Sequence, residues 1–119
     1  MNVAIWGASD KPDRYSHKAL KMLLEKKHRP FPVHPVLTDI DGQPVYAKLS
    51  DITEPMHTVT VYLSAENSRK SSADLMAVQV KRVIFNPGAE NPALAAELRA
   101  SGIEVVEACT LVMLATGQF

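Results

Sequence analysis

An apolar run, Val3-Ala4-Ile5-Trp6, is followed at once by Gly7-Ala8-Ser9-Asp10-Lys11-Pro12. A short run of strand-forming residues that ends at a glycine predicts a buried β-strand and a tight turn. Beyond the turn, apolar residues recur at helical spacing from residue 16 to residue 27, and Asp13 or Ser16 is the expected N-cap. A strand, a glycine turn and a helix in this order predict the first half of a β-α-β unit.

The rest of the chain repeats this alternation of strands and helices. Apolar or β-branched runs predict further strands at residues 31–35, 58–63, 81–85 and 103–106. Helices are expected at residues 71–79, 92–101 and 110–115, and Asn91 and Gly102 bracket the second of these. Turn-forming residues at 39–46 imply a long connection after the second strand.

Alternating strands and helices of this length require right-handed crossovers and a parallel sheet covered on both faces. We therefore expect one α/β domain over residues 1–119, with a Rossmann-like three-layer α/β/α architecture and a five-stranded parallel sheet. The expected strand order is 3-2-1-4-5, which places the first strand beside the fourth. A chain of 119 residues has the usual size of one domain, about 100–150 residues.

The composition excludes several classes of function. Thirteen basic and thirteen acidic side chains cancel, which argues against a nucleic-acid or membrane surface. No apolar run approaches the ~18 residues of a transmembrane helix, and the amino terminus lacks the features of a signal peptide. The single cysteine, Cys109, excludes an internal disulfide framework and forms no recognisable metal site with the scattered histidines. We expect a cytoplasmic protein.

In sheets of this type, ligands bind outside the carboxyl ends of the strands, where the winding direction reverses. At the first of these ends, Gly7 allows a tight turn, Ser9 offers a hydroxyl, and the next helix directs unpaired N–H groups at the cleft. Lys11 and Arg14 add positive charge, and a guanidinium fork suits phosphate oxygens. The loop therefore predicts a phosphate site, and solvated loop charges are the simpler alternative.

Two features bear on which nucleotide would bind. A strict dinucleotide fingerprint would place glycines at positions 7, 9 and 12, whereas this chain has Gly7, Ser9 and Pro12. An NAD-binding fold generally carries Asp or Glu at the end of its second strand, and here that place is taken by His34-Pro35. The missing carboxylate counts against NAD and is compatible with a ligand that has a phosphate on its ribose.

Three segments together resemble the small stand-alone CoA-binding protein family: residues 7–14, Pro32-Val33-His34-Pro35 and Phe85-Asn86-Pro87-Gly88-Ala89. That family is similar to the CoA-binding amino-terminal domain of the succinyl-CoA synthetase alpha subunit. The resemblance covers nearly the whole chain, and the G-A-S-x-K-P-x-R segment is its most specific part. His34 stands where the family usually has Asn, Leu63-Ser64 replaces Lys-Pro or Pro-Pro, and Asn86 replaces Gln.

The resemblance implies that coenzyme A is the cofactor and that four loops hold it. The residues it implies are Gly7, Ala8, Ser9, Lys11, Pro12, Arg14, Tyr15, His34, Pro35, Leu63, Ser64, Asn86, Pro87 and Gly88. The catalytic histidine of the synthetase lies in a second domain, so the resemblance implies binding without catalysis. We expect no nucleic-acid or membrane partner, an unidentified protein partner, and a monomer or homodimer. The alternatives are an NAD(P)-linked enzyme or redox sensor that uses the same loop, and a nucleotide-free interaction module.

Few side chains favour catalysis. The four histidines fall on different expected elements, and none has an Asp, Ser or Cys partner at an interpretable spacing. Ser9 lies on a strand-to-helix turn, but the surrounding sequence is not the G-x-S-x-G nucleophile elbow. Cys109 is expected near the start of the last helix, where the dipole favours a thiolate, although a buried inert thiol is the simpler interpretation. The resemblance also leaves open a mixed disulfide between Cys109 and the CoA thiol.

Overall fold

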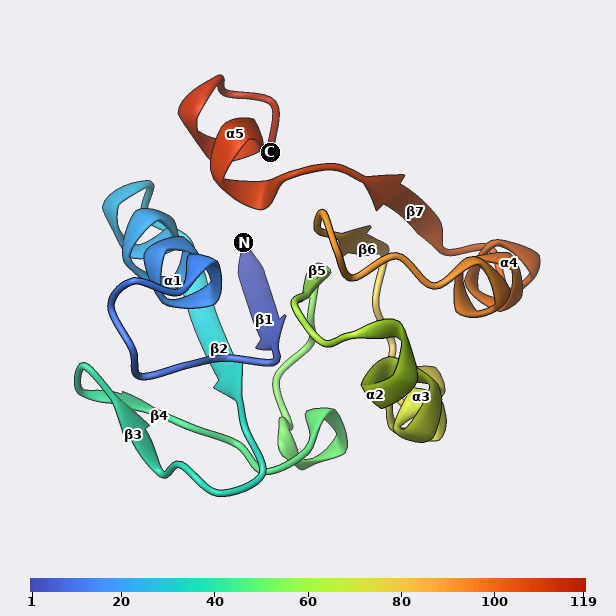
Figure 1. Ribbon diagram of the computed structural model, residues 1–119, viewed down its shortest axis with the longest axis horizontal. Helices are drawn as coiled ribbons and strands as arrows, with labels where there is room; N and C mark the ends of the chain where they lie inside the picture. Colours follow the sequence, from blue (N-terminus) through green and yellow to red (C-terminus); the bar gives the residue numbers. More distant parts are fainter.

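The computed structural model describes residues 1–119, and its centre is a five-stranded parallel sheet. The strands lie in the order β2-β1-β5-β6-β7 (Figure 1). Their bounds are β2 (Arg29–Val33), β1 (Asn2–Trp6), β5 (Thr58–Val61), β6 (Arg82–Phe85) and β7 (Glu104–Glu107). The predicted α/β class and the parallel five-stranded sheet are confirmed.

The predicted strand order 3-2-1-4-5 is wrong, because the third of the five strands, β5, lies between β1 and β6. In order of sequence the sheet reads 2-1-3-4-5. The connection from β2 to β5 contains no α-helix but a hairpin, β3 (Asp39–Ile40) with β4 (Gln43–Pro44), and a 3-10 helix, η1 (Leu49–Asp51). This connection crosses the sheet and buries Ile52 and Met56 in the same cluster as Trp6. The crossing carries the chain past β1 to its far side.

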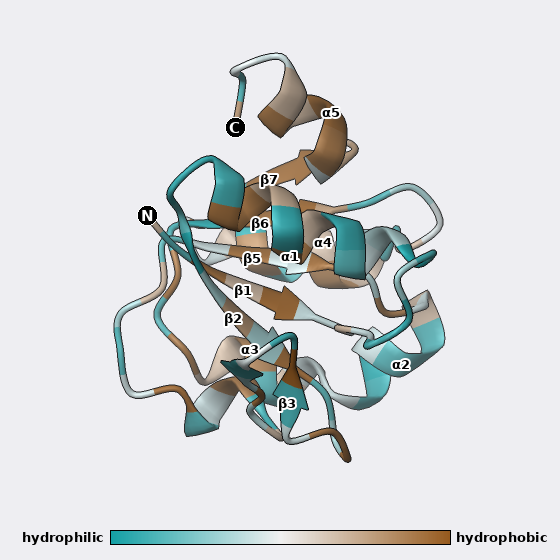
Figure 2. Ribbon diagram, turned by 90° about the vertical axis from the view of Figure 1, so that its left-hand side faces the viewer, coloured by the Kyte–Doolittle hydropathy of each residue, from teal (hydrophilic) through white to brown (hydrophobic).

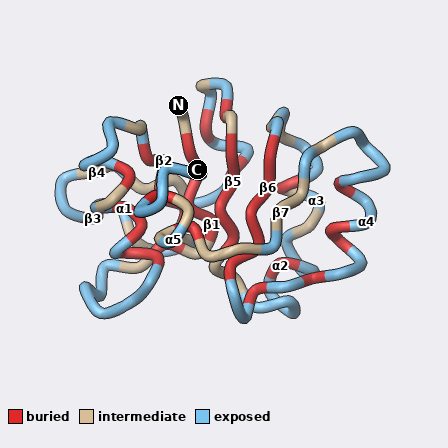
Figure 3. Tube along the Cα trace, turned by 90° about the horizontal axis from the view of Figure 1, so that it is seen from above, coloured by how far each residue is buried: buried red, intermediate tan, exposed pale blue.

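Helices cover both faces of the sheet (Figure 1). One face packs against α1 (Tyr15–Glu25) and α5 (Thr110–Ala115), and the other packs against α3 (Ser72–Met76), α4 (Pro92–Ala100) and η1. Val3 and Ile5 belong to the first layer and Ala4 and Trp6 to the second, so both faces of β1 are apolar. β1 is mainly hydrophobic (Figure 2), and the strands β1, β5 and β6 are buried (Figure 3), whereas the edge strand β7 is only partly buried.

The edge strand β2 runs through two prolines, although a proline normally ends a strand. The Arg29 N–H donates to the Met1 carbonyl oxygen, so residues 29, 31 and 33 direct their backbone groups at β1. Pro30 and Pro32 occupy the alternate positions, where the ladder with β1 requires no N–H donor. The Tyr46 N–H donates to the outward Pro32 carbonyl oxygen, which extends the cover of this edge.

The helix ends follow the sequence in part. Asn91 caps α4 as predicted, because its side-chain oxygen accepts a hydrogen bond from the Leu94 N–H at 3.2 Å. The expected cap of α1 by Asp13 or Ser16 is wrong, since the N-cap is Arg14 and no side chain caps this end. Ser16 is instead buried in the first turn. None of the helices combines the length and apolar character that crossing a membrane requires.

The single helix predicted at 71–79 is replaced by two short helices, α2 (Ala65–Lys70) and α3. Ser64 caps α2, since its hydroxyl accepts a hydrogen bond from the Asn67 N–H at 3.2 Å. The Asp74 carboxylate in α3 accepts from the N–H groups of Leu49 and Ser50 at 2.7 and 3.0 Å. This carboxylate therefore ties α3 to the start of η1 and fixes the long connection beside the sheet.

Candidate functional site

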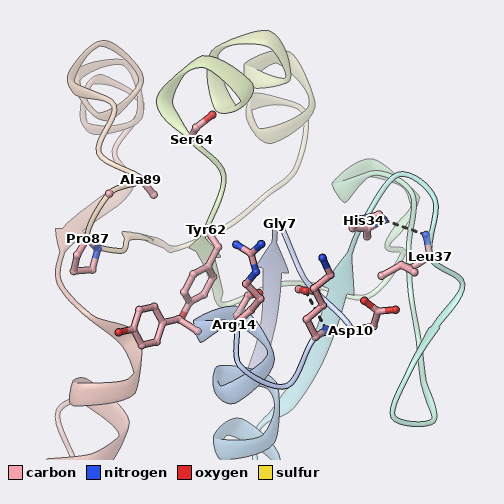
Figure 4. A pocket seen from close by; sticks show the side chains of 14 residues that line it. Gly7, Asp10, Arg14, His34, Leu37, Tyr62, Ser64, Pro87 and Ala89 are labelled. Atoms are coloured by element: carbon pink, nitrogen blue, oxygen red, sulfur yellow. Dashed lines mark hydrogen bonds between the residues drawn. The ribbon is translucent and has the colours of Figure 1, made fainter.

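The winding direction of the sheet reverses between β1 and β5, because the chain leaves β1 for β2 on one side and later returns to β5 on the other. Two adjoining cavities open at the carboxyl ends of these strands, with volumes of about 530 and 870 Å³. Both are lined by Gly7, His34, Tyr62 and Ser64, so they meet along the loops after β1, β2 and β5. Figure 4 shows the first cavity.

The floor of this cleft is a close approach of two backbone segments. Gly7 has a φ of +97°, a conformation that residues with a Cβ rarely adopt. A Cβ at this position would lie 3.0 Å from the backbone nitrogen of Leu63 and 3.1 Å from the carbonyl carbon of Tyr62. The N–H groups of Gly7 and Ala8 both donate to the Val33 carbonyl oxygen, at 3.3 and 3.1 Å. Glycine is thus required here both for the turn and for the space.

Several residues that line the first cavity have unpaired backbone donors. The Ser9 hydroxyl accepts from the Lys11 N–H at 3.1 Å and so shapes the loop. The N–H groups of Ser9, Asp10, Tyr15 and Ser16 have no acceptor within the chain. Tyr15 and Ser16 begin the 11-residue helix α1, so its positive dipole end adds to these donors. Unpaired donors at the start of a helix can hold an anion such as a phosphate.

Charged side chains complete this wall. Arg14 rises from the start of α1 toward the cavity, between Tyr62 and Asp10 (Figure 4). The four ion pairs of the structure involve other residues, so its guanidinium is uncompensated. Lys11 also lines the cavity, while Asp10 contributes one negative charge. The net charge of these three side chains is positive and favours an anionic ligand.

Tyr62 contributes an apolar ring to both cavities and remains a neutral phenol. Its hydroxyl is buried and makes no hydrogen bond of acceptable geometry, although it lies near the hydroxyls of Thr60 and Thr110. Those two hydroxyls bond to each other at 2.8 Å. Burial raises the pKa of Tyr62 to about 12, since water no longer solvates the phenolate.

Asn86, which the resemblance implies as a cofactor contact, turns its side chain inward and is only 3% exposed. Its amide nitrogen donates to the Thr60 hydroxyl at 2.7 Å and to the Val61 carbonyl oxygen at 2.9 Å. Its amide oxygen accepts from the Thr110 N–H at 2.8 Å. The side chain therefore joins the ends of β5 and β6 to the start of α5, and it lines neither cavity.

Most of the other predicted residues do line a cavity. Those on the first wall are Gly7, Ser9, Lys11, Arg14, Tyr15, His34, Ser64, Pro87 and Gly88. Those found only on the second wall are Ala8, Pro35 and Leu63. Pro12 lies on neither wall. Cys109 precedes α5 as expected and is half-buried rather than buried.

Several residues that line the cavities were not among those predicted from the sequence. In the first cavity these are Asp10, Ser16, Leu37, Tyr62 and Ala89, and in the second they include Lys48, Asn67 and Lys70. Tyr62 was expected inside a strand of residues 58–63, but β5 ends at Val61, so Tyr62 begins the loop. Lys48 lies on the long connection, and its position follows only from the path of that connection across the sheet.

Comparison with known proteins assigns this chain to a family. Residues 1–115 match the CoA binding domain family. The chain belongs to this family. The match confirms the resemblance inferred from residues 7–14, 32–35 and 85–89.

This CoA-binding domain is also similar to individual proteins. It is 31% identical over 64 residues to the uncharacterized protein YneT of Bacillus subtilis (strain 168), a match that covers 54% of this chain and 47% of YneT. The matched part thus spans about half the length of this curated relative. A crystal structure of an uncharacterized protein has 34% identity and a TM-score of 0.91, and the match covers 99% of this chain and 97% of that one. The structure of cell-free ID.343 from Thermus thermophilus has 26% identity and a TM-score of 0.89, with 99% and 90% covered.

Proposed function

We propose that this CoA-binding domain binds coenzyme A in the two adjoining cavities, with the pyrophosphate at the start of α1. The observation that carries the proposal is the group of unpaired N–H donors at Ser9, Asp10, Tyr15 and Ser16 beside the uncompensated guanidinium of Arg14. Backbone donors and a guanidinium are the groups that hold phosphate oxygens most strongly. Membership of the CoA binding domain family supports this ligand.

The shape and lining of the second cavity support an extended ligand. Each cavity lies within the range of about 300–1,000 Å³ that is typical of ligand sites. The second is lined by apolar side chains such as Trp6 and Leu63 and also by Lys48 and Lys70. A ligand that combines an aromatic base, a ribose phosphate and a pyrophosphate has the chemistry for both walls.

We further propose that the chain binds this ligand without transforming it. His17 has an acidic neighbour, with its Nε2 2.9 Å from the Asp41 carboxylate, but it is only 3% exposed and lines neither cavity. His34 lines both cavities, and its Nδ1 is occupied by two backbone N–H groups. No nucleophilic side chain on the cavity walls contacts a side chain that could act as its base, which supports a binding role.

Ligand-dependent thermal stabilisation tests the choice of nucleotide. A ligand at 100 times its Kd adds about 2.7 kcal/mol to the stability of the native state. We expect CoA to raise the melting temperature more than NAD or NADP at equal concentration, because β2 is followed by His34 rather than by an acidic residue. An equal or larger shift with either dinucleotide would refute the CoA assignment and favour the NAD(P)-linked alternative.

Incubation with a thioester tests the absence of chemistry. We expect acetyl-CoA to remain intact over hours with a stoichiometric amount of the chain, at the rate seen in buffer. Loss of the thioester that disappears on substitution of one wall side chain would contradict the binding role.

A further inference from the structure

His34 has a fixed tautomer that the sequence does not reveal. It follows β2 and is half-buried on the wall shared by the two cavities. Its Nδ1 lies 3.1 Å from the Val36 nitrogen and 3.0 Å from the Leu37 nitrogen, and both backbone N–H groups donate to it (Figure 4 shows the bond to Leu37). A ring nitrogen that accepts hydrogen bonds carries no proton, so the neutral ring must carry its hydrogen on Nε2.

The ring orientation is determined by the same two bonds. If the ring were turned over, a carbon would face the N–H groups of Val36 and Leu37 and leave both donors unpaired, which costs free energy. The backbone N–H of His34 also donates to the Tyr46 carbonyl oxygen at 2.9 Å, so the main chain at this position is fixed as well. The side chain therefore presents one N–H group in one direction.

The Nε2–H group has no partner within the chain. The His34 Nε2 is not among the buried polar atoms that lack a hydrogen-bond partner, so it is open to solvent. The residue lines both cavities, as do Gly7, Tyr62 and Ser64. A ligand that extends from one cavity into the other would run along a wall to which His34 contributes.

We propose that His34 is a specificity-determining donor whose Nε2–H group, oriented by the Val36 and Leu37 N–H groups, binds a phosphate oxygen of the ligand where the two cavities meet. The proposal rests on the proposed CoA function for its ligand, but the tautomer does not depend on it. Coenzyme A offers two sources of this oxygen, the pyrophosphate and the ribose 3′-phosphate. A directed donor at this position also replaces the acidic residue with which NAD-binding folds hold ribose hydroxyls.

The tautomer is tested on the free protein. We expect a long-range ¹H–¹⁵N correlation spectrum at pH 8 to show the proton of the His34 ring on Nε2, with the signal assigned by its loss in His34→Asn. A ring with its proton on Nδ1 would overturn the proposal, because that nitrogen could then accept nothing from Val36 and Leu37.

The donor role is tested with matched variants. Asn at position 34 can still accept backbone N–H bonds through its side-chain oxygen, but its amide N–H groups lie closer to the backbone than the Nε2–H group does. One hydrogen bond to a charged group corresponds to about a tenfold to hundredfold change in Kd, so we expect His34→Asn to weaken CoA binding by this factor with little change in melting temperature. His57→Asn is the control, since His57 precedes β5 at the opposite end of the sheet and lines neither cavity.

Titration with 3′-dephospho-CoA identifies the oxygen. If the loss in His34→Asn is seen with CoA alone, the acceptor is the 3′-phosphate, and if it is seen with both ligands, the acceptor is the pyrophosphate. Parent-like CoA affinity in His34→Asn would overturn the donor role and leave the proposed function intact. Failure of the parent to bind CoA would refute the proposed function and the ligand of this donor together.

Discussion

Replacement of Arg14 by alanine removes one charged contact without disturbing the fold. The Arg14 side chain is exposed, makes no ion pair and does not cap α1, so only its backbone holds the neighbouring turn. Its backbone carbonyl oxygen accepts from the N–H groups of His17 and Lys18, and alanine retains both bonds. Surface substitutions of this kind change stability by less than about 0.5 kcal/mol.

The effect on ligand binding should be larger. A hydrogen bond to a charged group contributes roughly 1.5–3 kcal/mol, which corresponds to about a tenfold to hundredfold change in Kd. We therefore expect Arg14→Ala to bind CoA about tenfold to a hundredfold more weakly than the parent, as measured by isothermal titration in moderate salt. Arg14→Lys should recover part of the loss, because it keeps the charge but not the planar fork.

A matched control distinguishes the loss of a contact at the site from the change in net charge of the molecule. Arg99 lies on the exposed side of α4, and Arg99→Ala makes the same change in charge away from both cavities. We expect its CoA affinity to equal that of the parent. Equal affinity of the parent and Arg14→Ala would remove this residue from the site and contradict the placement of the pyrophosphate at the start of α1.

Three further substitutions test the floor of the cleft by urea unfolding. Gly7→Ala should lower the free energy of unfolding by at least about 1–2 kcal/mol, because Gly7 has a positive φ and an added Cβ would crowd Leu63. Parent-like stability would contradict the close approach of the two backbone segments. Asn86→Ala should lower the free energy of unfolding by about 1–3 kcal/mol, because it leaves buried groups such as the Thr110 N–H unpaired. A loss of CoA affinity at parent-like stability would instead make Asn86 a contact residue. The free energy of unfolding of the parent should fall between pH 10 and 12, since the Tyr62 phenol ionises at a lower pH in the unfolded chain than in the folded protein. Tyr62→Phe should abolish this fall, and an unchanged fall would refute the raised pKa of Tyr62.

Much of the fold follows from local patterns in the sequence. The alternation of apolar runs and helical periodicity predicts the parallel sheet, and Asn91, Pro92 and Gly102 mark the ends of α4. The strand order does not follow from those patterns. Thr58-Val59-Thr60-Val61 is buried on both faces, which is typical of a central strand, but only the course of residues 34–57 across the sheet brings it beside β1.

The candidate site was predictable where backbone geometry dominates. Gly7 and the start of α1 follow from the order of strand, turn and helix, because the helix after the first strand begins at the carboxyl edge of the sheet, where ligands bind. The inward turn of Asn86 could not be predicted, since it depends on the position of Thr60 in the neighbouring strand. The same holds for His34, whose ring orientation depends on two N–H groups in the loop that follows it.

Backbone amide shifts in a ¹H–¹⁵N correlation spectrum, recorded during titration of the full chain with CoA, show which residues contact the ligand. We expect saturable shifts that are largest at the unpaired N–H groups of Ser9, Asp10, Tyr15 and Ser16. Residues at the opposite end of the sheet, such as His57, should remain unchanged. The absence of shifts, or shifts concentrated at that opposite end, would contradict the binding of coenzyme A at the start of α1.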